Sequence, residues 1–191
     1  MSDTVKIQST TKLAHNWGRF DDYVVSHRRT DGTSQTIRRE VYDHGSAAAV
    51  LLYAAQAGTV VLTRQFRLPP HLNGDLAWLI EVPAGLLDGE DPEVAARREA
   101  VEETGYEPAD LQFVFDAYMS PGSVTEKCAC FIGSYSPGQK VGSGGGLPSE
   151  GEDIEVLELG FDTTLAMIAN GEIVDAKTIM LLQALALRLS R

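Results

Sequence analysis

Hydrophobic and polar residues alternate along this chain with two different periods, and the changes of period mark its elements. Two apolar, β-branched runs at 47–54 and 59–67 are joined by a short glycine-containing link and predict a β-hairpin. Residues 20–28 and 34–43 flank Asp31-Gly32, a strong short-range signal for a turn, and predict a second hairpin. Further strands are expected at 77–85, 111–120, 127–135 and 154–160.

A helical period occurs at the end of the chain and once in its middle. Two C-terminal helices are predicted at 163–171 and 177–190. A third helix is expected over 92–104, because Asp91 is a suitable N-cap, Pro92 fits the first helical position and Gly105 provides a left-handed stop. The apolar side of this helix is expected to comprise Val94, Ala95 and Val101.

The mixture of strands and helices predicts an α/β fold with a mixed sheet. With 191 residues, of which 43% are apolar, the chain can form one sizeable core and is short for two ordinary domains. Residues 1–45 are expected to form a small N-terminal β-element and residues 46–191 the main domain. An edge hairpin on the main domain is an equally good interpretation of the N-terminal segment. The glycine-rich stretch at 144–151 predicts a flexible loop.

Charge and composition narrow the classes of function. The formal net charge of −11 argues against binding to nucleic acid or to an anionic membrane, both of which require a basic surface. No apolar run reaches eighteen residues, and the first ten residues lack the regions of a signal peptide, so a cytoplasmic protein is expected. Cys128 and Cys130 are two apart on one predicted strand, which is poor disulfide geometry, and buried thiols are expected.

Three carboxylates of the central helix are spaced three and four residues apart and therefore share one face: Glu99, Glu102 and Glu103. Like charges in this arrangement repel one another, whereas a divalent cation would make the same arrangement favourable. Clusters of carboxylate oxygens suit hard ions, so Mg²⁺ is expected and Mn²⁺ is possible. The alternative is a solvated acidic face with Arg97 and Arg98 as local ion-pair partners.

Residues 85–106 resemble the Nudix box, a pattern of glycine, five residues, glutamate, seven residues, and Arg-Glu-apolar-any-Glu-Glu-any-Gly-apolar. Glu90, Arg98 and Gly105 occupy matching positions, together with the carboxylates of the helix. One feature departs from the pattern, because only four residues separate Gly85 from Glu90. Either the loop is one residue short or Ala84 takes the place of the first glycine. The departure concerns the loop backbone and leaves the helix carboxylates intact.

Outside the box the chain resembles the bacterial GDP-mannose pyrophosphatase subgroup, which is related to the ADP-ribose pyrophosphatases. The resemblance rests on REVYDHG (39–45), VVLTRQFR (60–67), PAGLLD (83–88), AYMSPGSVTE (117–126), GGG…EGEDIEVLEL (144–159) and GEIVDAKT (171–178). It implies a Nudix-type α/β/α sandwich and a homodimer whose substrate site uses residues of both chains. It also implies hydrolysis of a nucleotide sugar, preferably GDP-mannose to GMP and mannose 1-phosphate. The alternatives are an ADP-ribose pyrophosphatase and a noncatalytic nucleotide-sugar sensor.

Attack of water on a diphosphate requires charge neutralisation and an activated water, which bound metal can supply. Glu99 and Glu103 are the expected metal ligands, with Glu102 as an additional or supporting one. The resemblance implies that the backbone carbonyl of Ala84 also binds metal. It further implies that Glu150 activates the water and that Glu152 binds metal, although by chemistry alone either loop glutamate can be the base. Gly85, Glu90, Arg98 and Gly105 are expected to be structural.

Arginines are the expected ligands of the substrate phosphates, because a guanidinium can donate to two phosphate oxygens at once. Arg67 ends a predicted strand beside a loop and is the expected diphosphate ligand. Arg64 lies three residues earlier, on the opposite face of that strand, and is expected in a structural ion pair. Arg38 and Arg39 are further candidates. Recognition of the base is open, with the side chains of Tyr23 and Tyr42 as possible stacking surfaces.

Overall fold

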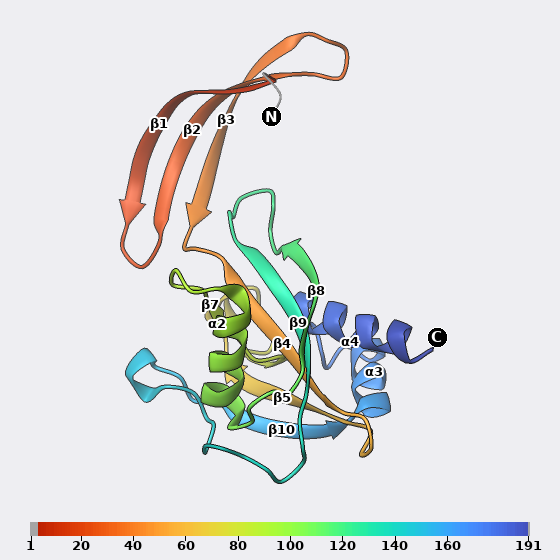
Figure 1. Cartoon of the computed structure of the whole chain (residues 1–191). Helices are drawn as coiled ribbons and strands as arrows, with labels where there is room; N and C mark the ends of the chain where they lie inside the picture. Colours follow the sequence, from red (N-terminus) through yellow and green to blue (C-terminus); the bar gives the residue numbers. More distant parts are fainter. Residues whose placement is uncertain (1–3, 191) are drawn as a thin grey trace. The chain divides into compact units, whose positions relative to one another are not determined.

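The computed structural model describes residues 4–190, and these residues divide into two compact units. The first unit contains the chain up to Ser46 together with Tyr118–Lys127. The second contains Ala47–Ala117 and the chain from Cys128 onward. Each unit has its own sheet (Figure 1).

The first unit is built on a three-stranded antiparallel sheet in the order β1-β2-β3. Its strands are β1 (Val5–His15), β2 (Arg19–Arg28) and β3 (Ser34–Asp43). The predicted hairpin corresponds to β2 and β3, whereas β1 was not predicted. All eleven residues of β1 are exposed, so the strand shows no alternation of buried and exposed positions that would reveal it.

The second unit contains a seven-stranded sheet in the order β10-β5-β4-β9-β8, with β6 paired to β5 and β7 paired to β4. Its strands are β4 (Ala47–Ala54), β5 (Thr59–Phe66), β6 (Trp78–Glu81), β7 (Ala84–Leu86), β8 (Leu111–Tyr118), β9 (Lys127–Ser134) and β10 (Glu155–Gly160). The pairing of β4 with β9 is parallel and the pairing of β4 with β5 is antiparallel, so the sheet is mixed, as the sequence predicts.

Helices cover both faces of this sheet (Figure 1). Helix α2 (Pro92–Glu99) lies on one face, and α3 (Phe161–Ala169) and α4 (Ala176–Leu189) lie on the other. The expected α/β/α sandwich is therefore confirmed. A short helix, α1 (Leu68–Leu72), occupies a segment that was predicted as a loop, because Pro69 and Pro70 fit a first helical turn.

The predicted strand at 77–85 is divided in two, and the prediction of one continuous strand was wrong. Residues 78–81 pair with β5, whereas residues 84–86 pair with β4. Pro83 lies at the crossing point, where it has no N–H for a ladder and its carbonyl accepts a hydrogen bond from Val50 N at 3.0 Å. This crossing brings the chain from the sheet directly to the start of α2.

Alternation along β4 builds the two layers of the core. Even-numbered residues such as Val50 and Leu52 join the cluster beneath α2, while Leu51 is equally buried on the opposite face. Helix α2 approaches the sheet closely because its buried side is made of alanines, Ala95, Ala96 and Ala100. The prediction that Val94 belongs to this side was wrong, since Val94 is 53% exposed.

Among residues 4–190, no helix is long and apolar enough to cross a membrane.

Candidate active site

The carboxylate-bearing helix has two parts. Helix α2 begins after Asp91, whose side chain accepts a hydrogen bond from Glu93 N at 2.9 Å, and Gly105 ends the helical segment with φ = 78°. Both predicted ends are confirmed. The last turn, Ala100–Thr104, is a π-helix, and within it the hydroxyl of Thr104 donates to the carbonyl of Ala100. The helix therefore widens where it carries its acidic residues.

Two of the helix carboxylates are buried. Glu99 is 8% exposed and Glu103 is 1% exposed, whereas Glu102 is partly exposed. Burial raises the pKa of Glu99 to about 7, against the lowering effect of Arg98. Burial also raises the pKa of Glu103 well above its ordinary value, and the charges of Glu99 and Glu152 add to this rise. Burial of these carboxylates therefore costs solvation free energy, and the charges of Arg98 and Arg67 offset it only in part, because the pKa values of Glu99 and Glu103 stay raised.

The donor set fits a divalent cation. One oxygen of Glu103, Oε2, is buried and has no hydrogen-bond partner, which is costly for a polar group unless a further ligand is bound. Within the described part of the chain, no three Asp, Glu, His or Cys side chains are already arranged closely enough to hold a metal ion, because the carboxylates are turned to other partners. Glu99 is turned to Arg98 at 2.7 Å, and Glu152 accepts from Leu147 N at 2.8 Å. Binding of a cation would replace contacts of this kind.

A glycine admits the carboxylate of Glu99 to this position. A Cβ atom on Gly85 would lie 1.9 Å from Oε1 of Glu99, so any side chain there would displace the carboxylate. Ala84, the expected source of a carbonyl ligand, precedes this glycine in β7. The backbone of β7 at Gly85 is thus packed directly against the carboxylate of Glu99.

The loop that carries Glu150 and Glu152 is attached to the end of the same helix. Gly145 N donates to the carbonyl of Glu103 at 2.8 Å, and Gly146 N donates to the carbonyl of Glu102 at 3.1 Å. These amides satisfy carbonyls that a helix end leaves without partners. The stretch is a loop, as predicted, and its glycines allow close packing of its backbone against the end of the helix.

The loop glutamates differ in their surroundings. The charge of Glu152 acts on both Glu99 and Glu103, so Glu152 lies near the buried carboxylates. Glu150 ends a 3₁₀ turn, Pro148–Glu150, and is exposed.

Arg64 lies in β5, Arg67 directly follows that strand, and the two arginines form separate ion pairs. Arg64 forms an exposed ion pair with Glu155 at 2.9 Å. Arg67 donates from Nε to Glu81 at 2.8 Å and from Nη2 to the same carboxylate at 3.2 Å. Burial alone would lower the pKa of Arg67, but Glu81 and then Glu103 raise it, so the guanidinium lies within the field of the acidic cluster.

The other candidate side chains lie in the first unit. Arg38 forms an ion pair with the buried Asp22 at 2.7 Å, and the Arg39 guanidinium donates to the carbonyl of Arg38 at 2.8 Å. Tyr23 donates to Asp21 at 3.3 Å, and the ring of Tyr42 lies 5.4 Å from that of His44.

Comparison with known proteins agrees with this geometry. A family model described as the NUDIX domain matches residues 43–182. The chain belongs to the Nudix family. A second model, described as the GDP-mannose pyrophosphatase NudK N-terminal domain, matches residues 4–42. The resemblance inferred from the sequence is confirmed.

Curated Nudix relatives cover most of the chain. A GDP-mannose pyrophosphatase of Yersinia pestis (strain Pestoides F) is 50% identical over 172 residues, which are 90% of this chain and 86% of the relative. A GDP-mannose pyrophosphatase of Pectobacterium atrosepticum is 47% identical over 98% of this chain and 97% of the relative. The crystal structure of an ADP compounds hydrolase superposes with a TM-score of 0.73 at 18% identity, covering 98% of this chain and 95% of that chain, and this likeness shows the fold alone.

The departure from the Nudix box has a local explanation. Asp88 and Gly89 both have positive φ, 48° and 88°, and Glu90 N donates to the carbonyl of Leu87 at 2.8 Å. This is the pattern of a type I′ turn, which needs only two central residues. A tight turn therefore replaces part of the longer loop and still delivers Glu90 to the helix.

Arg98 of the Nudix box joins the loop to the helix. Its guanidinium contacts Glu90 at 2.9 Å, Glu99 at 2.7 Å and Glu102 at 3.0 Å, and it donates to the carbonyl of Leu86 at 3.2 Å. The ion pair with Glu90 fits the structural role expected for both residues. Arg97 and Arg98, the partners expected for a solvated acidic face, do form ion pairs with glutamates of the helix. Neither of these two arginines forms an ion pair with Glu103.

Three polar residues near the Nudix site were not singled out from the sequence: Glu81, Asp175 and Lys177. Glu81 stands in the apolar segment WLIEV, where a charged residue at a buried strand position was the available signal. Asp175 and Lys177 fall in GEIVDAKT, which contributed to the resemblance without a role being assigned to either residue.

Proposed function

We propose that this Nudix protein hydrolyses the diphosphate of a nucleoside diphosphate sugar, with GDP-mannose preferred and GMP and mannose 1-phosphate as products. The cluster of buried carboxylates, with an unpartnered oxygen on Glu103, supports the metal-dependent chemistry. The curated relatives, which are called GDP-mannose pyrophosphatases, support the choice of substrate. Mg²⁺ is the proposed ion and Mn²⁺ a substitute, because the donors are carboxylate oxygens.

The proposed roles follow the positions of the acidic side chains. Glu99, Glu103 and Glu152, with the carbonyl of Ala84, would hold the metal, and Glu102 would support them. A bound divalent ion would offset the charge of the phosphate oxygens and lower the pKa of a bound water. Glu150 would take the proton of the attacking water as the water oxygen bonds to phosphorus and the bridging P–O bond breaks. Its exposed position on the 3₁₀ turn leaves its carboxylate uncommitted to the buried cluster.

Arg67 is the proposed ligand of the nonbridging diphosphate oxygens. Its side chain is 40% exposed although the carboxylate that holds it is buried, so a ligand can reach the guanidinium. The charge of Glu103 acts on Arg67, which supports a position of the guanidinium near the proposed metal ligands.

A substrate comparison tests this function. Purified protein with Mg²⁺ is supplied separately with GDP-mannose, GDP-glucose, ADP-ribose and NADH at equal concentration, and released nucleoside monophosphate is measured. We expect the highest kcat/KM for GDP-mannose. Equal or faster turnover of ADP-ribose would overturn the preference, and no hydrolysis of any of the four would overturn the enzymatic proposal in favour of a nucleotide-sugar sensor.

We also propose that the protein is a homodimer formed through its N-terminal sheet. Apolar side chains of this unit are exposed, with Val5 at 63%, Ile7 at 59% and Trp17 at 73%. Light scattering after gel filtration should give twice the chain mass of 20.7 kDa. Ile7→Glu should shift the protein toward monomer and Lys6→Gln should not, whereas a monomeric wild type at micromolar concentration would contradict the proposal.

The proposed compartment is the cytoplasm. Cys128 and Cys130 are both buried, with their sulfur atoms 4.0 Å apart, and reduced thiols are maintained in that compartment. Thiol labelling of the unfolded protein, taken directly from cells, should find both cysteines reduced.

A further inference from the structure

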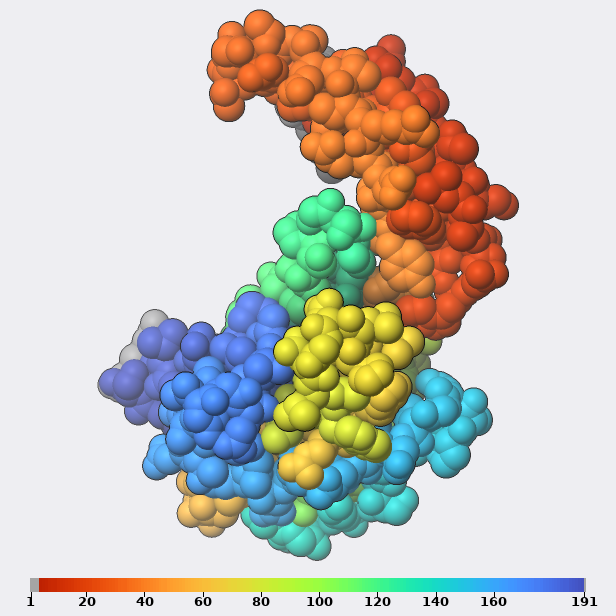
Figure 2. Space-filling model, turned by 180° about the vertical axis from the view of Figure 1, so that it is seen from behind, coloured from red at the N-terminus to blue at the C-terminus, as the bar shows by residue number. Residues whose placement is uncertain are grey.

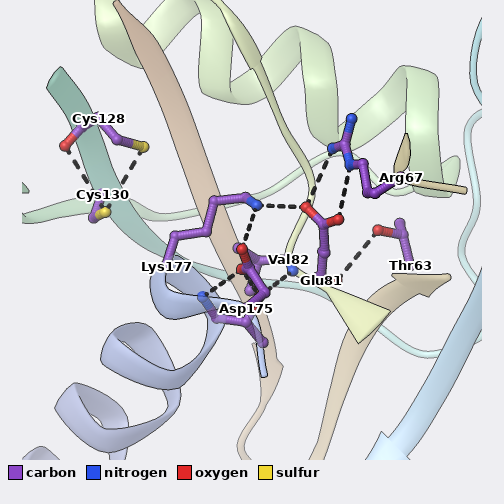
Figure 3. A network of polar contacts seen from close by, with 9 residues as sticks. Thr63, Arg67, Glu81, Val82, Cys128, Cys130, Asp175 and Lys177 are labelled. Atoms are coloured by element: carbon purple, nitrogen blue, oxygen red, sulfur yellow. Dashed lines mark hydrogen bonds and ion pairs between the residues drawn. The ribbon is translucent and has the colours of Figure 1, made fainter. Parts of the chain in front are cut away.

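Glu81 lies between two cations at the end of β6. Its side chain is 2% exposed, and its two oxygens accept hydrogen bonds from Nε and Nη2 of Arg67. The ammonium group of Lys177 also donates to Oε2 (Figure 3). A buried strand carboxylate is thus held by one cation from the end of β5 and one from α4.

The charges of this cluster balance. Lys177 has a second carboxylate partner, Asp175, at 2.9 Å. Burial alone would raise the pKa of Glu81, but Lys177 and Arg67 together lower it below the ordinary value. Glu81 therefore remains an anion, and removal of one partner would leave a buried charge uncompensated.

The remaining contacts fix Glu81 from the side of α4. The side chain of Asp175 caps this helix by accepting from Thr178 N at 2.9 Å. The hydroxyl of Thr178 in turn accepts from Val82 N at 2.8 Å, so the residue next to Glu81 is bonded to the first turn of α4. Figure 2 shows the segment around β6 in yellow against the α3–α4 segment in blue.

The guanidinium that Glu81 holds, that of Arg67, is accessible to ligands. Two nitrogens of Arg67 are bound in a fork by Glu81, while its side chain remains 40% exposed. A fork contact to one carboxylate fixes the plane of the guanidinium as well as its position. The Arg64–Glu155 pair, which joins β5 to β10, differs, because both of its side chains are exposed, at 41% and 57%.

We propose that Glu81 is a positioning residue, which orients the Arg67 guanidinium toward the substrate diphosphate and is itself held by Lys177. This inference rests on the proposed function, because it assigns Arg67 to the diphosphate. Glu81 touches neither substrate nor metal in this role. Its effect on the reaction passes through Arg67.

The test is a double-mutant cycle measured with the nucleotide sugar that the wild type hydrolyses best. Glu81→Gln keeps the size of the side chain and removes its charge, and we expect KM to rise about tenfold with kcat within about threefold. Arg67→Ala should raise KM at least as much. The double variant should resemble Arg67→Ala alone, because a residue that acts through Arg67 has no further effect once Arg67 is absent.

Two further variants keep the result interpretable. Glu155→Gln removes the carboxylate of the exposed Arg64 pair and should leave KM unchanged. Glu81→Asp keeps the charge on a shorter stem, so it should fold even if Glu81→Gln does not, and should still raise KM. Effects of Glu81 and Arg67 that multiply in the double variant would overturn the inference, as would a loss of thermal stability with KM unchanged.

Failure of the inference can be distinguished from failure of the proposed function. If the wild type hydrolyses none of the four substrates, the proposed function fails, and binding of inorganic pyrophosphate with Mg²⁺ is measured by calorimetry instead. In that case, the positioning role would be supported if Glu81→Gln weakened pyrophosphate binding in the wild-type background but not in the Arg67→Ala background. Equal affinity of wild type and Glu81→Gln would overturn it.

Discussion

Replacement of Glu103 by Gln should lower kcat/KM by about 10³-fold or more, because an amide removes the charge that holds the proposed metal ion. Glu103 is 1% exposed and its Oε2 has no protein partner, so no other side chain substitutes for it at this position. Hydrolysis of GDP-mannose and binding of Mn²⁺, followed by electron paramagnetic resonance, measure the two consequences separately. The variant should fold, since Gln has nearly the same size and relieves repulsion from Glu99 and Glu152.

Variants of the other glutamates should separate metal binding from catalysis. Glu99→Gln and Glu152→Gln should weaken both Mn²⁺ binding and hydrolysis. Glu150→Gln should retain Mn²⁺ binding and lose about 10² to 10⁴ in kcat, the range of a general base. Glu93→Gln is the matched control, because Glu93 lies on the same helix, is exposed and pairs only locally with Arg97 at 3.0 Å. Full activity of Glu150→Gln at saturating Mg²⁺ would remove Glu150 from the proposed role, and unchanged Mn²⁺ binding in Glu103→Gln would do the same for Glu103.

Gly144→Ala should lower kcat/KM by about 10²-fold, because displacement of a catalytic group by about 1 Å can have that cost. A Cβ at Gly144 would lie 2.5 Å from the carbonyl carbon of Thr104 and 2.8 Å from the carbonyl oxygen of Glu103. These atoms belong to backbone, so the loop must move away from the helix and carry Glu152 with it. Steady-state kinetics and Mn²⁺ affinity should both change.

Backbone strain requires a separate control, because Gly144 has φ = 65° and any side chain is strained there. Gly138 has φ = 77°, and a methyl group added to it would meet no atom within 4 Å, so Gly138→Ala has the strain without the collision. We expect Gly138→Ala to reduce stability by roughly 1 kcal/mol and to leave kcat/KM near the wild-type value. Equal losses of activity in both variants would show that strain, and not the position of the loop, explains the effect.

The parts of the fold that the sequence predicts are those in which local chemistry and burial agree. Asp91, Pro92 and Gly105 delimit the helix correctly because capping depends on residues next to each other in the chain. The β1 strand was missed because it is exposed throughout, and Pro83 divides a strand whose composition suggests a continuous one.

In the candidate site, too, the features that depend on local sequence were predictable and the nonlocal contacts were not. The Nudix box identifies the helix carboxylates because their spacing is local, and the expected ion pair of Arg64 is present. Glu81 and Lys177 meet across 96 residues of sequence, so no local pattern connects them. The attachment of Gly145 to the carbonyl of Glu103 is equally nonlocal, which is why a stretch of glycines suggested flexibility.

The placement of the acidic residues along their helix has a consequence for folding. Anions are stabilised near the positive N-terminal end of a helix dipole, yet Glu99, Glu102 and Glu103 lie in the C-terminal half, next to its negative end. The dipole therefore adds to the repulsion among these carboxylates in the metal-free protein. A divalent ion would relieve both effects at once, so we expect the integrity of this helix to be linked to the supply of metal.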